Sequence, residues 1–378
     1  MTRKLYYEDS DLLQFNAVVT GCAEAKGGYE VTLDQTAFYP EGGGQPWDTG
    51  CLDNAAVLQV TEQGEDVVHL CDQPLTVGQT VSGTVNGDRR LDLMQQHSGE
   101  HILSGIICSK YGASNVGFHV GTHIMEIDFD RPIPAEDLPG LELSANEAIW
   151  KDLPIFCSYP ENPGNYRSKK ELSGPVRIVE IPGYDRCACC GVHVKHAGQI
   201  GLIKIVSMVK FHQGVRLELL CGKRAYDYVA AVAEQNKQIS ALLSAKPLET
   251  AAAAKRLTEQ LSAEKFRSAG LEKQLFASIA ASYTNREKVL HFQDGLTPAG
   301  VRELADIIGR VAETAVVCTF LENGCSICII GKNAKELGTK AAAALNGRGG
   351  GKPEAFQGNI QADQEQIAAF FRAEGFTV

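Results

Sequence analysis

Two pairs of metal-binding residue types lie far apart in this 378-residue sequence and share one spacing. His97 and His101 stand four residues apart in QHSGEH, and Cys189 and His193 stand four residues apart in CACCGVHV. Residues i and i+4 share one face of a helix, so the first pair can direct both imidazoles toward one point. Zinc binds Cys sulfur and His nitrogen tetrahedrally. The pairs therefore predict one zinc site, which requires the chain to bring these two distant segments together.

Neighbouring residues leave several interpretations of this site open. Cys187 and Cys190 are competing thiols, although the spacing favours Cys189. Four protein ligands are typical of a structural zinc site, whereas a catalytic site keeps one position open. HSGEH also satisfies H-x-x-E-H, the signature of inverted zincin peptidases, in which Glu100 would activate water. That alternative leaves Cys189 and His193 unexplained.

Composition and length indicate a globular protein of more than one domain. Hydrophobic residues make up 44% and charged residues 22% of the chain. At about 150 residues per domain, this length suggests two or three domains. The N-terminus lacks the apolar core of a signal peptide, and no apolar run is long enough to span a membrane, so we expect a soluble cytoplasmic protein. Thiols stay reduced in that compartment, which leaves the 12 cysteines free to bind metal.

Charge is distributed unevenly along the chain. The formal net charge of −10 argues against a general nucleic-acid coating protein, because phosphate binding depends on Lys and Arg. Residues 331–352, however, carry five bases and one acid, a local net charge of +4. We therefore expect any contact with phosphates at the C-terminal end.

Hydrophobic patterning predicts an α+β fold of four parts. Short alternating segments over residues 13–85 predict the strands of a small β-barrel, and residues 91–111 have helical periodicity around the His pair. Further segments predict a helix at 135–151 and strands at 124–129, 155–160, 176–181 and 200–207. The expected parts are a barrel domain (1–88), a zinc-binding α+β domain (89–222), a helical connector (223–285) and a C-terminal α/β module (286–378).

The connector and the C-terminal module have distinct patterns. Pro247 divides the connector into two predicted helices. The connector also has an apolar stripe, which comprises Leu257, Leu261, Leu271 and Leu275. This stripe predicts helix packing within the chain. The alternative is a homodimer contact through the connector or the C-terminal module. In the C-terminal module the segments KVLHF, TAVVCTFLE and SICIIG predict strands, and residues 298–313, 333–345 and 361–374 predict helices.

Four motifs occur in the order seen in one known family. TAFYPEGGGQPWDTG (36–50), QHSGEHILSG (96–105) and CACCGVHV (187–194) resemble the editing region of alanyl-tRNA synthetase and of its freestanding relatives, the AlaX alanyl-tRNA editing proteins. LNGRGGGKPEAFQG (345–358) resembles the glycine-rich signature of the synthetase's C-terminal domain, so the chain is similar to the long form of AlaX. The resemblance implies a zinc-dependent hydrolase whose partner is tRNA(Ala) mischarged with serine and, secondarily, glycine. It also implies a barrel followed by an editing domain shared with threonyl-tRNA synthetase.

The resemblance assigns substrate contacts around the first motif. Thr36 matches the family's threonine before FYPEGGGQ, and a hydroxyl that bonds the seryl side chain would be left unpaired by alanine. Gly43, Gly44 and Gln45 would form a wall of the pocket for the tRNA end, because absent side chains let a ligand approach the backbone. His119, in GFHVG, is a further candidate for contacting substrate. Without the motif, Thr36 would be an ordinary strand residue and the glycines a hairpin turn.

Other roles follow from the remaining motifs. Glu100 stands where the synthetase commonly has Thr, and it is either the base for an attacking water or a group that orients His101. Val192 is a second departure, where the family has Thr. Asp48 is expected to fix the glycine-rich loop. The predicted tRNA contacts combine two cations with backbone amides and comprise Arg348, Gly349, Gly350, Gly351 and Lys352, although a lone glycine run would more often be a flexible loop.

Overall fold

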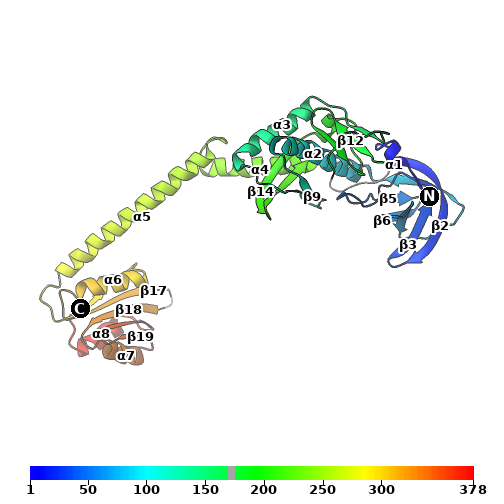
Figure 1. Ribbon diagram of the computed structural model, residues 1–378. Helices are drawn as coiled ribbons and strands as arrows, with labels where there is room; N and C mark the ends of the chain where they lie inside the picture. Colours follow the sequence, from blue (N-terminus) through cyan, green and yellow to red (C-terminus); the bar gives the residue numbers. More distant parts are fainter. Residues whose placement is uncertain (169–174, 323) are drawn as a thin grey trace. The chain divides into compact units, whose positions relative to one another are not determined.

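The structure, a computed structural model, describes residues 1–168, 175–322 and 324–378 (Figure 1). The chain divides into two compact units, Met1–Ile239 and Ser240–Val378, which are described separately. Helices and both parallel and antiparallel strand pairs occur, so the predicted α+β class is confirmed. The finer division into four parts stays a prediction.

The first unit begins with a closed barrel of strands. Its order is β2 (Gln14–Ala25), β3 (Gly28–Leu33), β7 (Asp66–Cys71), β6 (Ala55–Gln63), β5 (Gly50–Leu52) and β8 (Thr80–Val85). Alternate residues of β2 point inward, since Phe15, Ala17 and Val19 are buried and the residues between them are exposed. Two short strands, β1 (Arg3–Lys4) and β4 (Gln35–Thr36), pair in parallel, and α1 (Leu5–Glu8) follows β1. The closed sheet occupies the region where the sequence predicts a small barrel.

The helix α2 (Gly87–Tyr111) forms the centre of the region after the barrel. Asn86 caps its start by accepting a hydrogen bond from the backbone N–H of Arg89, and Gly112 ends it in the left-handed conformation. The helix contacts α3 (Leu138–Trp150), which follows the short 3-10 turn η1 (Ala135–Asp137), and it also contacts the 3-10 helix η2 (Ala197–Ile200). These contacts bury most of α2.

Two antiparallel sheets complete this region and contact α2. One has the order β14 (Ile203–Phe211), β15 (Gly214–Cys221), β10 (Met125–Phe129) and β9 (Asn115–Val120). The other has the order β11 (Phe156–Ser158), β12 (Ile178–Ile181) and β13 (Asp185–Ala188). Strands β9, β13 and β15 are not predicted from the sequence. Strand β13 carries the chain directly into the CACCGVHV motif.

A buried ion pair joins the barrel to α2. Arg90 is 1% exposed and Asp48 is fully buried, and their closest N–O distance is 2.5 Å. Asp48 also accepts the backbone N–H of Tyr39 at 2.6 Å, while Arg90 donates to the carbonyls of Ser10 and Ala37. Asp48 therefore fixes the glycine-rich loop, as the sequence predicts, and it holds that loop to the helix.

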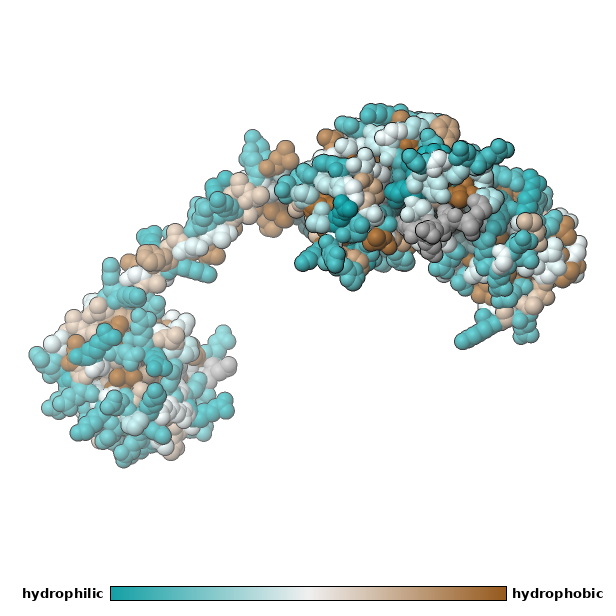
Figure 2. All heavy atoms as spheres, in the orientation of Figure 1, coloured by the Kyte–Doolittle hydropathy of each residue, from teal (hydrophilic) through white to brown (hydrophobic). Residues whose placement is uncertain are grey.

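Two helices occupy the end of the first unit and the start of the second. Helix α4 (Gly222–Leu242) and helix α5 (Thr250–Ala281) are separated at Pro247, as predicted. The leucine stripe of α5 is between 49% and 57% exposed, so the prediction that it packs within the chain is wrong. Figure 2 shows hydrophobic residues interspersed with hydrophilic ones along this helix. A seam with a second copy stays a prediction. None of the helices formed by the described residues combines the length and apolarity that a membrane span requires.

The second unit is a five-stranded sheet with helices on both faces. Its order is β16 (Lys288–Phe292), β17 (Thr314–Leu321), β18 (Gly324–Gly331), β20 (Ala355–Ile360) and β19 (Arg348–Lys352). The end of α5 and α6 (Pro298–Ile308) share one hydrophobic core with the sheet, and α7 (Ala334–Ala344) and α8 (Gln364–Ala373) share another. Figure 1 shows α6 and α7 on opposite sides of the strands. The predicted strands and helices are present, whereas β19 and β20 are not predicted.

Thr36 lies inside the barrel with its hydroxyl fully used. The Nδ1 of His69 lies 3.1 Å from the carbonyl of Val31 and donates to it, so its Nε2 accepts from the Thr36 hydroxyl at 2.8 Å. The same hydroxyl accepts the backbone N–H of Phe38 at 3.1 Å. Burial lowers the pKa of His69 to about 4, which keeps it neutral. The expected contact of Thr36 with a substrate hydroxyl is therefore corrected, because Thr36 is fully buried and already paired.

We predict that Thr36→Val destabilises the barrel. The substitution leaves His69 Nε2 and the Phe38 N–H unpaired in a buried place, and we expect the free energy of unfolding to fall by about 1–3 kcal/mol. Urea unfolding followed by the fluorescence of Trp47, whose indole N–H bonds the carbonyl of Leu58, measures this change. Thr36→Ser, which keeps the hydroxyl, should restore most of the stability. A valine variant as stable as the parent would contradict the assignment.

Candidate metal centre

The four donors predicted from the sequence come together in the structure. The donor atoms of His97, His101, Cys189 and His193 all lie within 4.8 Å of one another. Cys189 Sγ is 3.3 Å from His97 Nε2 and 3.5 Å from His193 Nε2. A tetrahedral zinc ion, with Zn–S of about 2.3 Å and Zn–N of about 2.0 Å, holds sulfur and nitrogen about 3.5 Å apart. The three imidazoles are each 2% exposed, so the donor set fits a buried zinc ion.

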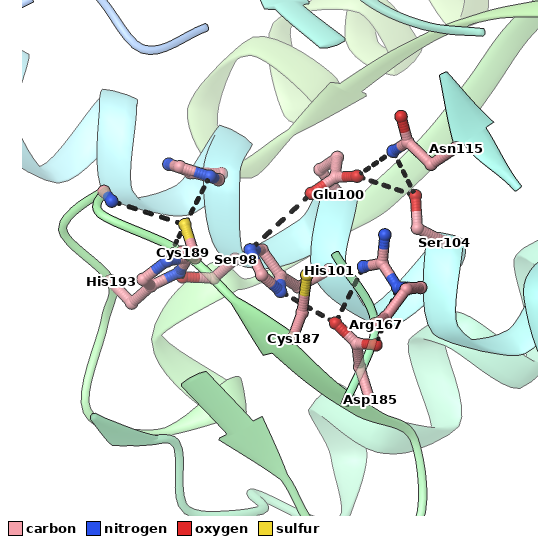
Figure 3. A network of polar contacts seen from close by, with 12 residues as sticks. Ser98, Glu100, His101, Ser104, Asn115, Arg167, Asp185, Cys187, Cys189 and His193 are labelled. Carbon is pink, nitrogen blue, oxygen red and sulfur yellow. Dashed lines mark hydrogen bonds and ion pairs between the residues drawn. The ribbon is translucent and has the colours of Figure 1, made fainter. Parts of the chain in front are cut away.

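Each imidazole is oriented by a bond from its other nitrogen, and Figure 3 shows the bond between His101 and Asp185. His97 Nδ1 lies 2.7 Å from Gln45 Oε1, and His101 Nδ1 lies 2.7 Å from Asp185 Oδ2. His193 Nδ1 lies 3.2 Å from Ser98 Oγ. Amide and carboxylate oxygens only accept, so the first two Nδ1 atoms carry a proton. This arrangement directs the Nε2 atoms of the two helix histidines toward the centre, where a metal ion would take the place of any proton that they carry.

Asp185 and Arg167 belong to this site, although neither residue is predicted from the sequence. Arg167 donates to both carboxylate oxygens of Asp185, at 3.0 and 2.8 Å. Burial raises the pKa of Asp185, but His101 and Arg167 outweigh it and hold that pKa below its usual value. An acid before CACC in YDRCACC is the available signal, and no spacing rule connects it to a histidine 84 residues earlier.

The thiol of Cys189 is poised to bind a cation. Burial raises its pKa, but the charges of His97 and His101 outweigh burial and hold the pKa well below its usual value. The thiolate is the form that binds metal. For His101, burial lowers the pKa, but the Cys189 thiolate and Asp185 outweigh it and raise the pKa to about 10. Positive charge is thus favoured beside the thiolate, in the form of a proton or of a metal ion.

The two competing thiols are placed differently. Cys187 lies with His101 and Asp185 in a second group of possible ligands, but burial raises the pKa of its thiol and favours the protonated form. Cys190 is exposed and lies in neither group that the described residues form, and its carbonyl accepts the hydroxyl of Tyr7 at 2.9 Å. The geometry therefore favours Cys189, the ligand chosen on spacing.

Glu100 is held rigidly beside the donors. Its Oε1 accepts hydrogen bonds from Ser104 Oγ at 2.7 Å and from Asn115 Nδ2, and its Oε2 lies 3.8 Å from His101 Nε2. Figure 3 shows these groups converging on the carboxylate. Glu100 is 2% exposed and lies on the wall of a cavity. A carboxylate in this place can hold a proton next to a bound cation.

The cavity beside the donors has a volume of about 410 Å³. Arg167 and Arg177 bring two cationic side chains to its wall. The complete lining within the described residues comprises Gly43, His97, Glu100, His101, Arg167, Ser168, Pro175, Val176, Arg177, Cys187, Ala188, Cys189 and Cys190. The cavity falls in the range of small-molecule sites, about 300–1,000 Å³.

Three consecutive residues of the glycine-rich loop, Gly43, Gly44 and Gln45, lie near the candidate site and make different contacts. Gly43 and Gly44 form a two-residue turn with φ of 61° and 87°, and Gly42 and Gln45 exchange backbone hydrogen bonds across it. Gly43 lines the cavity. A Cβ on Gly44 would lie 2.5 Å from the carbonyl oxygen of Phe118, so the loop packs closely on β9. Gln45 Oε1 bonds His97, while its buried Nε2 has no hydrogen-bond partner among the described residues. Of these three residues, Gly43 is the one that lines the cavity.

His119 does not reach the cavity. It is exposed on β9, where successive side chains point to opposite faces. The preceding residue, Phe118, faces the site instead, and its ring centroid lies 4.8 Å from that of His97. The expected substrate contact of His119 is corrected for this reason.

The glycine run near the C-terminus is an edge strand. All five residues of β19 are exposed, and the strand pairs only with β20 within its sheet. A Cβ on Gly349 would lie 2.5 Å from the ring of Phe356, whereas nothing lies within 4 Å of a Cβ on Gly350. Strand alternation places Arg348, Gly350 and Lys352 on one face. Two cations therefore flank bare backbone, in place of the flexible loop that a glycine run alone suggests.

Comparison with known proteins agrees with these features. The chain matches the family of class II (A) tRNA synthetases over residues 4–89 and the threonyl and alanyl tRNA synthetase second additional domain over residues 176–217. An alanine–tRNA ligase of Thermofilum pendens is 32% identical over 95% of this chain, which spans 42% of the ligase. The C-Ala domain from Aquifex aeolicus alanyl-tRNA synthetase matches 24% of this chain and 89% of its own at 18% identity, with a TM-score of 0.22 that is too low to establish a shared fold.

Freestanding relatives cover nearly the same length as this chain. The mouse alanyl-tRNA editing protein Aarsd1 is 28% identical over 94% of this chain and 93% of its own. The Xenopus laevis alanyl-tRNA editing protein Aarsd1-A is 31% identical over 88% of this chain and 84% of its own. On this similarity, the chain belongs to the family of alanyl-tRNA editing proteins.

Proposed function

We propose that this protein hydrolyses the ester bond of tRNA(Ala) mischarged with serine, with glycine as the second amino acid that it removes. The observation that carries the proposal is a cluster of four possible metal donors beside one cavity, which Glu100 and three of the donors, His97, His101 and Cys189, line in a member of this family. Hydrolysis adds water across the ester, with hydroxyl going to the acyl carbon and a proton to the ribose oxygen. The cavity volume suits an aminoacyl group with its ribose.

The donors are the residues that would hold zinc. When bound by His97, His101, Cys189 and His193, zinc would supply positive charge that polarises an ester or acidifies water. Gln45, Asp185 and Ser98 support this role by fixing the imidazoles. Outer partners of this kind are worth about 10–100-fold in metal affinity.

Glu100 would act as the general base. Its bonds to Ser104 and Asn115 fix one carboxylate oxygen and leave the carboxylate beside the donors, where it can accept a proton from the attacking water. The alternative, in which Glu100 only orients His101, is supported less because the 3.8 Å distance is too long for a hydrogen bond.

One observation supports a second candidate, a noncatalytic tRNA-binding protein with structural zinc. Four protein donors complete a tetrahedron, as in structural sites. The neighbouring cavity and buried Glu100 favour the hydrolase over this candidate. The peptidase alternative is supported least, because it gives no role to Cys189 and His193 beside the histidine pair.

The edge strand β19 would bind tRNA(Ala). Arg348 and Lys352 can meet phosphates on either side of Gly350, where no side chain keeps an RNA backbone away. This placement also suits the local charge of the C-terminal segment.

We predict that Cys189→Ala loses zinc and that Cys190→Ala keeps it. The first variant removes a donor from the cluster, and we expect a loss in zinc affinity greater than the roughly 10–100-fold that outer partners contribute. The second removes a neighbouring exposed thiol and serves as the matched control. Metal analysis of both proteins after dialysis against a weak chelator makes the comparison. Equal zinc content in the two variants would exclude Cys189 as a ligand.

We predict that the full chain releases serine and glycine from tRNA(Ala) faster than alanine and that a chelator stops the reaction. Glu100→Gln should lower kcat by about 10²–10⁴-fold with zinc content unchanged, because the amide keeps an acceptor but cannot take a proton. Release of labelled amino acid from each charged tRNA measures both effects. A zinc-loaded parent that leaves seryl-tRNA(Ala) intact would favour the structural-zinc candidate.

We predict that the double variant Arg348→Ala/Lys352→Ala binds tRNA(Ala) more weakly and with a flatter salt dependence. Two lost phosphate contacts should lower the slope of log K against log salt by about 1.4–1.8. Zinc content should not change. Lys340→Ala, which removes a cation that is paired with Glu374, is the control. An unaltered slope in the double variant would count against β19 as an RNA contact.

A further inference from the structure

An aromatic cluster lies next to the candidate metal centre and has no role in the chemistry above. Tyr7, on α1, packs its ring 6.5 Å from that of Tyr159 in an edge-on arrangement. The guanidinium of Arg177 lies 4.7 Å from the centre of the Tyr7 ring. Tyr159 follows β11 and is 55% exposed, so the outer member of this cluster presents its ring to solvent.

The cluster is tied by hydrogen bonds to the segment that carries Cys189. The Tyr7 hydroxyl donates to the carbonyl of Cys190, and Arg177 donates to the carbonyls of Cys189 and Gly191. Arg177 and Cys190 also line the cavity. Three segments distant in sequence therefore form one rigid continuation of the cavity wall, with α1 beside β12 (Figure 1).

We propose that Tyr159, supported by Tyr7 and Arg177, is a stacking platform for a base in the single-stranded 3′ end of an RNA whose last ribose enters the cavity. The proposal rests on the proposed function and names a subsite for its substrate. Exposed aromatic rings bind unpaired bases of any sequence, because every base offers a flat π-face.

Position and charge favour an RNA end over a protein partner. The scissile ester is attached to the terminal ribose, so the bases next to it must lie within about one or two nucleotides of the donors. The aromatic cluster adjoins the cavity at Cys190, which lines the cavity and whose carbonyl accepts the Tyr7 hydroxyl. The cation under the Tyr7 ring also suits a polyanion. A protein partner would use a broader apolar surface than one exposed tyrosine.

A neighbouring aromatic residue provides a matched control. Phe156 is 54% exposed, nearly the same as Tyr159, and lies three residues earlier in the chain. Strand alternation directs Phe156 to the side of β11 opposite Cys157, whereas Tyr159 follows Cys157 by two residues. Burial raises the pKa of the Cys157 thiol and the nearby guanidinium of Arg177 opposes that rise, so Cys157 lies close to Arg177. Phe156 is therefore equally exposed but is directed away from the cluster.

The test is binding of a short RNA that carries no amino acid to the full chain. Its sequence is ACC followed by 2-aminopurine. This probe contains the 3′ end alone, so it avoids the proposed contacts of β19. Stacking quenches 2-aminopurine fluorescence. We expect Tyr159→Ala to weaken binding about tenfold and to reduce the quench, since one base–aromatic stack is worth about that factor or more. Tyr159→Phe keeps the ring and should bind as the parent does, as should Phe156→Ala.

The outcomes separate the platform from the proposed function. Equal affinity of Tyr159→Ala and parent, or an equal loss in Phe156→Ala, would overturn the platform whatever the hydrolytic activity is. Loss of binding in Tyr159→Ala alone supports it even if the parent fails to deacylate seryl-tRNA(Ala). With an active parent, Tyr159→Ala should raise KM with little change in kcat, because the base contact is equal in the ground and transition states.

Discussion

The pair Arg90–Asp48 is the constraint on which the candidate site depends. Arg90 lies in the first turn of the helix that carries His97 and His101, and Asp48 follows Gln45 in the glycine-rich loop segment. Both charges are buried, and removal of one partner from such a pair typically costs about 3–5 kcal/mol. Since Arg90 also donates to the carbonyls of Ser10 and Ala37, one guanidinium fixes three segments that connect to the barrel strands against α2. This contact therefore positions α2 and the glycine-rich loop, which together contribute Gly43, His97, Glu100 and His101 to the cavity lining.

Two of the candidate metal donors could be predicted from sequence because helix geometry converts spacing into direction. His97 and His101 meet on α2 through the i, i+4 rule. Cys189 and His193 lie on a loop after β13, where the same interval agrees with the structure but no helix rule explains it. Long periodic segments were also predictable, as α2, α4 and α5 illustrate. Strands such as β13 and β15 escaped prediction because strand pairing depends on partners far along the chain.

The remaining errors share a physical origin. Thr36 was placed at the substrate because a motif gives residue identity but not which way a hydroxyl points, and His69, a barrel residue 33 positions later, uses that hydroxyl. His119 and Phe118 differ by one residue, and strand alternation alone decides which faces His97. Asp185 could not be found because its bond to His101 crosses 84 residues. Leu257 shows that a pattern identifies a face but not what covers it.

The bond between Gln45 and His97 has a consequence for the stability of the whole first unit. It runs from a barrel loop to the central helix, and a Cβ on Gly191 would lie 2.1 Å from the His97 ring and 3.0 Å from Gln45 Oε1. The loop that carries Gln45, helix α2 and the segment around Gly191 are therefore in direct contact at this point. A cation that binds only this assembled arrangement stabilises it by mass action. Binding of a cation here and docking of the barrel would therefore be thermodynamically linked, and each would raise the equilibrium constant of the other.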